Sequence, residues 1–145
     1  MAVQDWEGYL FATINENGQI IQRFPDKYIK LDSFEVTPNQ REEIKAYRDD
    51  YSRNLHRVTA PGTKSKIAFI TRPDLHLSEV YEIDSFFTTA EIVELERKVR
   101  LKYWNQEDYQ YKTGYFYRPN HPYKYKKISD SDIQFDEIGF ELIEY

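Results

Sequence analysis

The feature that most restricts the fold of this chain is a run in which aromatic residues alternate with other residues. The residues at every second position of this run are Tyr109, Tyr111, Thr113, Tyr115 and Tyr117. Because successive side chains of a strand point to opposite faces, the run predicts a long β-strand over 108–118. Aromatic residues make up 17% of the chain, with 13 Tyr and 9 Phe, and this composition favours strands elsewhere too.

Turn-forming residues divide the N-terminal part into further strands. Residues 9–14 and 19–24 flank Asn17-Gly18, which can adopt the positive φ angles of a type I′ turn, so they predict a hairpin. Residues 28–36 alternate in polarity with one change of parity, which indicates a strand with a β-bulge.

Two more strands and one helix are predicted in the rest of the chain. Residues 64–71 and 133–145 alternate between apolar and polar positions, as strands with one buried face do. Residues 88–102 predict the helix. They open with the capping-box spacing of Thr88 and Glu91, and an apolar stripe at i, i+3 and i+7 follows.

Residues 41–57 are compatible with two structures. Ile44, Tyr47, Tyr51 and Leu55 lie at helical spacing, which favours an amphipathic helix. The stretch from Asp49 to Asn54 is rich in turn formers, which favours a hairpin. On local spacing alone the helix is slightly favoured.

These elements predict a mainly β fold of the α+β class. About seven or eight strands and one helix fit an antiparallel β sandwich or barrel with the helix over 88–102 on its flank. The length of 145 residues suits a single domain over 1–145, and a chain of this size can bury a hydrophobic core.

Charge is unevenly distributed along the chain, and the net charge of −5 argues against a general nucleic-acid binder. Residues 39–72 hold eight basic residues and four acidic ones, and residues 112–127 hold five basic residues and no acid. Residues 129–145 hold six acids and no base. Such asymmetry lets a positive face of one copy meet a negative face of the next, although solvated faces give the same pattern.

The sequence contains no signal for export or membrane insertion. Asp5 and Glu7 interrupt the first eight residues, which have no apolar run, so we expect no Sec signal. No stretch approaches the roughly 18 apolar residues that span a bilayer. The absence of cysteine excludes disulfides. We therefore expect a protein made in a cytoplasm and not inserted in a membrane.

No residue pattern predicts catalysis, a cofactor or a metal. Asp74, His76 and Glu79 lie close enough in sequence to ligate a divalent cation, but they follow a proline and a solvated loop is the favoured interpretation. Ser52 and His56 lack the Gly-x-Ser-x-Gly context of a hydrolase nucleophile. None of the five glycines forms a phosphate loop. We therefore predict a protein that is not an enzyme.

The tyrosine-rich segment 109–125 has three interpretations. Cross-strand packing is favoured, a subunit interface is the second, and a platform for stacking sugars or bases is the third. Basic residues between the aromatic ones fit base stacking, but the acidic remainder of the chain weighs against it.

Several motifs in a fixed order give the chain a resemblance to a known group of proteins. They are Val36-Thr37-Pro38-Asn39-Gln40-Arg41, Ala46-Tyr47-Arg48-Asp49, Leu55-His56-Arg57, Thr63-Lys64-Ser65-Lys66-Ile67-Ala68-Phe69, Tyr115-Phe116-Tyr117 and Phe140-Glu141-Leu142-Ile143-Glu144. In this order, over residues 28–145, the chain resembles small tail proteins encoded by phages and prophages of Gram-positive bacteria.

The resemblance implies a tail-tube or distal-tail type of fold, a β sandwich or barrel with one flanking helix, of which six copies usually close into a ring. It also implies that residues 41–57 form a long hairpin rather than a helix. Family members often have glycine in the turn of this hairpin, whereas this chain has Asp50-Tyr51-Ser52-Arg53, so the turn type is left open.

The function that the resemblance implies is structural. We expect a ring-forming subunit of a bacteriophage tail, in the tail tube or at the tail tip or baseplate, assembled in the host cytoplasm and retained in the virion. Its partners would be itself, as a hexamer, and other tail proteins, with DNA only as passing cargo. The candidate interface residues are Arg41, Tyr47, Arg48, Asp49, Arg53, Arg57, Tyr115 and Tyr117. Acids of 129–145 are candidates for the wall of the lumen.

Two other functions are considered. A carbohydrate- or receptor-binding module of the same particle would present aromatic side chains such as Trp104 and Tyr109 in a shallow groove. A small enzyme would need a deep cleft that brings Asp74, His76 and Glu79 to metal distance.

Overall fold

The computed structural model describes residues 4–41, 43–59 and 62–145. Its helices are the 3₁₀ turn η1 (Asp26–Tyr28) and the α-helix α1 (Leu77–Thr88). Its strands are β1 (Phe11–Ile14), β2 (Ile20–Arg23), β3 (Glu35–Gln40), β4 (Glu43–Arg48), β5 (Leu55–Thr59), β6 (Lys64–Ile70), β7 (Leu75–His76), β8 (Glu91–Val93), β9 (Lys98–Asn105), β10 (Gln110–Tyr117), β11 (Tyr125–Ile128), β12 (Ile133–Phe135) and β13 (Gly139–Glu144).

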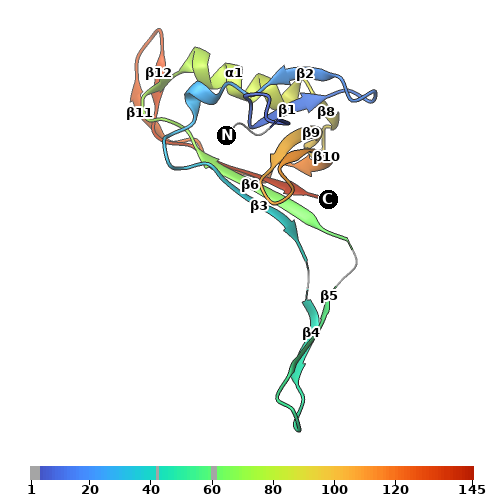
Figure 1. Ribbon diagram of the computed structural model, residues 1–145. Helices are drawn as coiled ribbons and strands as arrows, with labels where there is room; N and C mark the ends of the chain where they lie inside the picture. The colour runs from blue at the N-terminus through green and yellow to red at the C-terminus, as the bar shows by residue number, and fades with distance from the viewer. Residues whose placement is uncertain (1–3, 42, 60–61) are drawn as a thin grey trace.

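An eight-stranded antiparallel sheet forms the body of the molecule (Figure 1). The strand order is β2-β1-β9-β10-β13-β6-β3, and β8 pairs with β9 beside this path. A three-stranded sheet, β11-β12-β7, and a separate two-stranded sheet, β4-β5, complete the fold. The prediction of a mainly β, α+β fold with antiparallel sheets and one α-helix is confirmed. The main sheet is open, with β2 and β3 at its edges, so of the two predicted architectures, sandwich or barrel, the closed barrel does not form.

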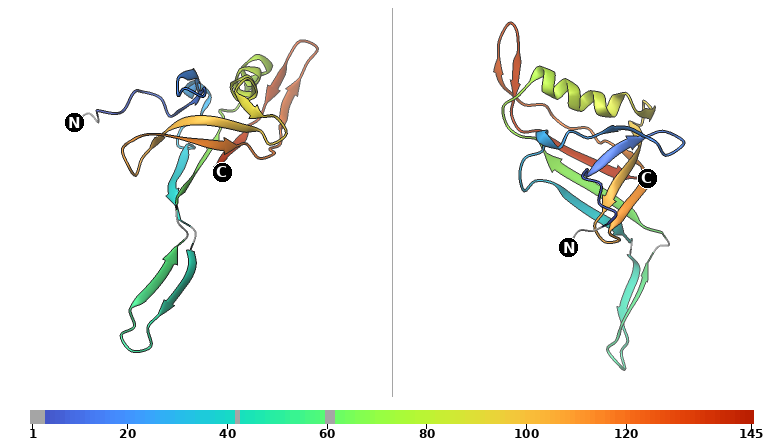
Figure 2. Two further views of the ribbon diagram at one scale, coloured as in Figure 1. Left: turned by 90° about the vertical axis from the view of Figure 1, so that its right-hand side faces the viewer. Right: turned by 45° about the horizontal axis from the view of Figure 1, so that its top comes forward.

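The hydrophobic core lies between one face of the main sheet and α1, whose inward residues Val80, Ile83, Phe86 and Phe87 are buried. The rings of this core pack edge to face and offset-stacked, for example Phe24 against Phe86 with centroids 5.1 Å apart. Such geometry is favoured because the positive edge of one ring meets the negative face of another. Figure 2 shows α1 beside the sheet in two further views.

The predicted position of the helix, 88–102, is wrong, since α1 ends at Thr88. The capping box that starts α1 is made by His76 and Glu79, and the Glu79 carboxylate accepts a hydrogen bond from the His76 backbone N–H at 3.0 Å. Residues 98–105 form β9 instead, and every second side chain of this strand is buried. Leu95, which the helix would have placed in the core, is 99% exposed.

Three strand predictions hold with changed limits. The strand predicted over 108–118 is β10, and the strand predicted over 64–71 is β6. The strand predicted over 133–145 is divided into β12 and β13 by residues 136–138. The buried side chains expected on one face of β6 and of the C-terminal strand are indeed buried. They are Ile67, Phe69, Ile138, Phe140 and Leu142.

Two details of the N-terminal part differ from expectation. The hairpin over 9–24 forms, but only Gly18 of its Asn17-Gly18 pair has a positive φ, so the turn is not type I′. The Asn15 side chain organises this loop by accepting hydrogen bonds from the backbone N–H groups of Asn17 and Gln19. The strand predicted over 28–36 is replaced by η1 and an irregular segment, and β3 begins only at Glu35.

Among the described residues, no helix is long and apolar enough to cross a membrane.

Candidate interaction site

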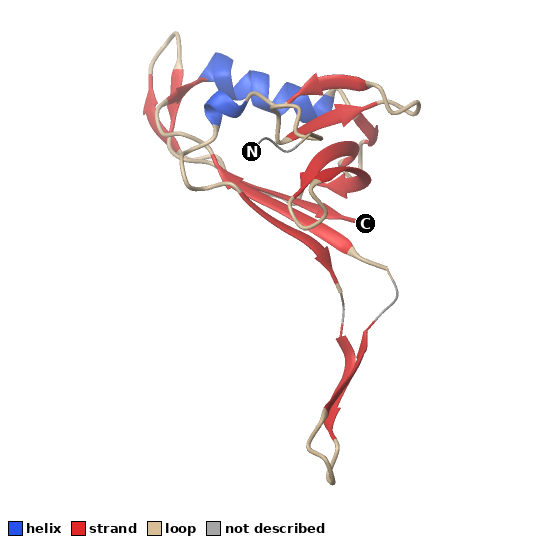
Figure 3. Cartoon of the chain, in the orientation of Figure 1, coloured by secondary structure: helices blue, strands red, loops and turns tan. Residues whose placement is uncertain are grey.

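A long hairpin, which we call the arm (β4 and β5, residues 43–59), projects from the body of the molecule (Figure 1). Figure 3 shows that strand structure extends along most of its length. Its two strands are antiparallel, and Tyr47 lies opposite His56 with the two rings stacked 5.0 Å apart. The sequence left 41–57 open between a helix and a hairpin; for the described residues the structure forms the hairpin that the resemblance implied, and residue 42 lies outside them.

The arm carries large apolar side chains that the body does not cover. Tyr51 at the tip is fully exposed, and Tyr47 and Leu55 are 49% and 51% exposed. An isolated two-stranded hairpin is at best marginally stable in water, because one face of a hairpin has nothing to pack against. The arm therefore has the properties of an element that is stabilised by contact with another surface.

The tip of the arm is held by Asp49. Its carboxylate accepts hydrogen bonds from the backbone N–H groups of Tyr51 and Ser52, at 2.7 and 3.1 Å. Both bonds lower the pKa of Asp49 because they stabilise the ionised carboxylate, and the bond from Ser52 has the larger effect. Arg53, in the turn where family members often have glycine, adopts a positive φ of 64°, so the turn forms without glycine.

A buried polar network fixes the base of the arm to the sheet. Asn39, near the end of β3, accepts a hydrogen bond from the Asn105 side chain at 3.1 Å, and its backbone N–H donates to Ser65 Oγ. Ser65, in β6, is also hydrogen-bonded to the Tyr103 hydroxyl at 2.8 Å. Ser65, Tyr103 and Asn105 are buried, so these bonds satisfy groups that water does not reach.

Three further contacts complete this anchor. The Asn39 side chain donates to Asp108 at 3.0 Å, and Lys112 forms an ion pair with the same carboxylate. Both contacts lower the pKa of Asp108, and the contact with Lys112 has the larger effect. The backbone N–H of Ser65 donates to the Glu144 carboxylate at 2.8 Å. The end of β3 and the start of β6, which lead to the arm, are therefore held by contacts to β9, β13 and the segment between β9 and β10.

The eight candidate interface residues lie in two places. Arg41, Tyr47, Arg48, Asp49, Arg53 and Arg57 lie on the arm or just before it. Tyr115 and Tyr117 lie on β10 in the body and make local contacts: the Lys98 ammonium lies 5.0 Å from the Tyr115 ring, and Tyr117 packs edge-on against Tyr145. Five of the eight thus lie on the arm, Arg41 precedes it, and the two tyrosines lie elsewhere, on the body.

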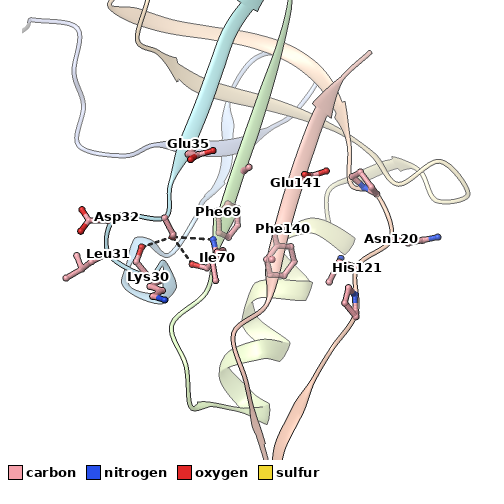
Figure 4. A pocket seen from close by; sticks show the side chains of 15 residues that line it. Lys30, Leu31, Asp32, Glu35, Phe69, Ile70, Asn120, His121, Phe140 and Glu141 are labelled. Atoms are coloured by element: carbon pink, nitrogen blue, oxygen red, sulfur yellow. Dashed lines mark hydrogen bonds between the residues drawn. The ribbon is translucent and has the colours of Figure 1, made fainter.

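A groove that the sequence did not predict lies on the outer face of β3, β6 and β13 (Figure 4). We call it the acidic groove; its volume is about 660 Å³. In Figure 4, Leu31 and Asp32 lie on one side of it and Asn120 and His121 on the other. Its lining includes the small residues Ala68 and Gly139, which leave space above the sheet. The strand pairing that forms the floor of the groove joins residues far apart in sequence, so no local pattern could indicate it.

His121 has a half-buried ring that packs against Phe140 with centroids 4.5 Å apart. Burial lowers the pKa of His121, and the nearby positive charge of Arg118 lowers it further. Arg118 itself is buried, and its guanidinium lies 3.4 Å from the Asp84 carboxylate and 4.9 Å from the Phe87 ring. This cluster joins the groove wall to α1.

An aromatic cluster lies on another part of the body. Both tryptophans of the chain take part, and the Trp6 ring lies 5.2 Å from Trp104 and 6.2 Å from Tyr111. Trp6 is 43% exposed, and Tyr109 nearby in sequence is 54% exposed. Trp104 donates its indole N–H to Gln106 at 2.9 Å. The cluster combines a stacking surface with polar groups.

The titratable residues considered for catalysis have separate partners. Asp74 pairs with Lys126 at 2.5 Å, His76 with Asp132 at 2.6 Å, and Glu79 caps α1. Among the described residues, no group of three or more His, Cys, Asp or Glu is arranged to hold a metal ion. Ser52 lies in the arm tip, and His56 stacks on Tyr47.

The acids of 129–145 are mostly paired within the molecule. Three of them form ion pairs, Asp136 with Lys124, Glu137 with Lys30 and Glu141 with Lys66, and Asp132 is hydrogen-bonded to the His76 ring. Glu144 accepts the hydrogen bond from Ser65. The charge asymmetry of the sequence is thus partly neutralised in the fold, which weakens the case that these acids line a lumen.

The fold and the arm define a class: a β-rich α+β protein with an open antiparallel sheet and one projecting hairpin. The chain belongs to the family described as Family of unknown function (DUF6711), whose model matches residues 5–145. A comparison with curated proteins finds no match.

Proposed function

We propose that this protein is a structural subunit of a bacteriophage tail that associates with copies of itself into a ring, a hexamer by the resemblance. It would lie in the tail tube or at the tail tip or baseplate of the virion, in contact with other tail proteins. Its role would be geometric rather than catalytic, with DNA passing through the ring as cargo.

The observation that carries this proposal is the arm. It exposes Tyr47, Tyr51 and Leu55 to solvent and extends away from the core (Figure 2). Aromatic and arginine side chains are enriched at protein interfaces, and the arm presents both kinds at its distal end. The polar anchor at Asn39 and Ser65 holds its base in a defined direction, as an arm that must meet a neighbour at a fixed angle requires.

The open edge of the main sheet gives further support. β2 is an edge strand of four residues that exposes Ile20 and Ile21, 38% and 52% accessible. Natural proteins usually protect sheet edges with charge or proline, because an apolar edge pairs with other chains. An edge of this kind fits a subunit that is covered in an assembly.

Electron microscopy of the negatively stained protein tests the proposal directly. We expect rings or stacked rings for the wild-type chain. A variant in which residues 44–58 are replaced by a flexible Gly-Ser linker keeps the sheet and helix but lacks the arm, so we expect it to remain monomeric by light scattering.

A matched control retains the arm and changes an exposed charge elsewhere. Lys127→Glu alters an exposed residue of β11 and should assemble as the wild type does. A wild-type chain that stays monomeric by light scattering, both alone and with other tail proteins present, would contradict the proposal.

The aromatic cluster favours a second candidate function, a carbohydrate- or receptor-binding module of the same particle. Sugar rings stack on exposed aromatic faces, and Trp6 and Tyr109 are exposed here. Binding to a glycan array by the wild-type chain, lost in Trp6→Ala and retained in the Lys127→Glu control, would support this function. Absence of any glycan binding above that of an unrelated protein would exclude it.

A further inference from the structure

We propose that the acidic groove of one copy receives the arm of a second copy, with Arg53 of the arm between Glu35 and Glu141 of the groove. This inference rests on the proposed function, because it names the surface that the arm contacts when copies associate.

The groove presents two carboxylates on either side of a small residue. Ala68 pairs with Glu35 on one neighbouring strand and with Glu141 on the other, so the three form one row on the outer face of the sheet. Adjacent strands lie about 4.8 Å apart, so the two glutamates are separated by roughly 10 Å of backbone with only a methyl group between them. A guanidinium with five N–H donors can lie over Ala68 and donate to both carboxylates.

The charges around the row leave it acidic. Glu141 forms an ion pair with Lys66 at 3.3 Å, and Lys30 forms an ion pair with Glu137 at 2.8 Å. Asp32 and Glu35 form no ion pair within residues 4–41, 43–59 and 62–145. The groove therefore attracts a cationic side chain and repels the phosphates of nucleic acid.

The distal end of the arm supplies the complementary groups. Arg48 and Arg53 are both exposed there, and Arg48 donates a hydrogen bond to the Arg53 carbonyl at 3.2 Å, which holds the Arg48 guanidinium beside the backbone of Arg53. The arm also exposes Tyr51 and Leu55, and the groove exposes Leu31, which is 80% accessible, at its rim. The tip also carries Asp49, which is bonded to the backbone N–H groups of Tyr51 and Ser52, and the exposed Asp50. The charge match therefore rests on the two arginine side chains, and the apolar match on Tyr51, Leu55 and Leu31.

The two surfaces lie at opposite ends of the same strands. Glu35 is the first residue of β3 and lies in the groove, whereas Gln40 is the last and leads toward the arm. An arm that points away from its own groove reaches only the groove of another copy (Figures 1 and 4). The contact is head-to-tail, and contacts of this type close into rings when the rotation between copies permits.

Charge reversal with rescue tests the contact. Arg53→Glu and Glu35→Lys should each weaken self-association at least about tenfold by sedimentation velocity, because each places like charges together. An equimolar mixture of the two variants should restore it, because the reversed arm of one meets the reversed groove of the other. The double variant should also associate.

The controls separate this contact from a general effect of charge. Lys127→Glu and Glu94→Lys make the same charge changes at exposed residues outside the arm and the groove, and should associate as the wild type does. Circular dichroism spectra confirm that each variant is folded. If both reversals weaken association but neither the mixture nor the double variant restores it, Arg53 and Glu35 do not meet, and the proposal is overturned.

Disulfide trapping gives an independent test, because the natural chain has no cysteine. Ser52→Cys at the arm tip with Asn120→Cys at the groove rim should yield, on mild oxidation, peptides that join position 52 of one copy to position 120 of another. Ser52→Cys with Glu16→Cys, in the exposed loop between β1 and β2, is the matched control.

The outcomes distinguish this inference from the proposed function. If the protein forms rings, but position 52 is not linked to position 120 above the control level and Glu35→Lys does not weaken association, the groove is not the partner of the arm. The proposal of a ring-forming subunit would then remain supported. A wild-type chain that does not self-associate, alone or with other tail proteins, would overturn both.

Discussion

Asn39 connects the arm to the body at the scale of a single residue. It adopts a positive φ of 53°, which costs a non-glycine residue about 1 kcal/mol, and its side chain accepts the hydrogen bond of the fully buried Asn105 amide. Asn39→Ala keeps the strained conformation and leaves Asn105 without this partner. We expect it to lower the free energy of unfolding by about 2–4 kcal/mol, measured by urea denaturation.

Asn39→Gly is the matched variant, because glycine adopts a positive φ without strain but also lacks the amide. It should lose about 1 kcal/mol less than Asn39→Ala. Equal losses for the two variants would mean that the backbone conformation contributes nothing to the anchor.

His121 makes stability depend on pH. Its pKa lies below the ordinary 6.5 because burial disfavours the imidazolium, so the unfolded chain binds more protons than the folded one as the pH falls through 6.5. The contribution of His121 is therefore complete above pH 6.5, decreases below it, and levels off under the lowered pKa. The free energy of unfolding should therefore decrease as the pH is lowered through 6.5.

Replacing the histidine isolates this effect from other titrating groups. His121→Gln should show a smaller decrease over the same pH range than the wild type, in urea denaturation at each pH. His56→Gln, which changes a histidine on the exposed arm, should retain the full decrease. If His121→Gln shows the same decrease in unfolding free energy as the wild type, another residue causes the pH dependence.

At the scale of elements, the segment 88–105 shows how two periodicities compete in one sequence. Ile92, Leu95 and Val99 have helical spacing, but Val99, Leu101 and Tyr103 alternate with Lys98, Arg100 and Lys102. The alternation prevails because pairing with β1 and β10 buries every second residue of β9. The pairing with β1 links residues about 90 positions apart, and a local pattern contains no information about it.

Substitutions in the two candidate helices give a direct check. Ile83 is fully buried in α1, so Ile83→Ala should lower the free energy of unfolding by about 2–5 kcal/mol. Leu95 is 99% exposed, so Leu95→Ala should change it by less than about 0.5 kcal/mol. Urea denaturation measures both changes. A large loss of unfolding free energy in Leu95→Ala would mean that Leu95 is buried, which contradicts the structure.

The parts of the fold that the sequence predicts best are those with a strong period of two. Alternation alone predicts β6 and β10, and alternation over 133–145 predicts the strand whose side chains Phe140 and Leu142 are buried in β13. The arm is different, because Ile44, Tyr47, Tyr51 and Leu55 favour a helix and only the resemblance implied a hairpin. The acidic groove could not be predicted, since Glu35, Ala68 and Glu141 become neighbours only through strand pairing.

At the scale of the whole molecule, stability is distributed unevenly. The core between α1 and the sheet contains most of the buried rings, whereas the arm is a two-stranded extension with exposed side chains. Elements with few buried contacts open at low free energy, while core strands open only when the whole domain unfolds. The arm should therefore gain its order from association, and the body should not.

Hydrogen exchange followed by mass spectrometry tests this coupling. In dilute protein, amides of the arm that include Tyr47 and Leu55 should exchange rapidly, whereas amides of β9 should be strongly protected. In the assembled form the arm amides should exchange on the order of 10–100 times more slowly, because the neighbouring copy covers them. The β9 amides serve as the internal control and should not change. Arm amides that are as well protected in the dilute monomer as in the assembly would show that the arm is stable alone.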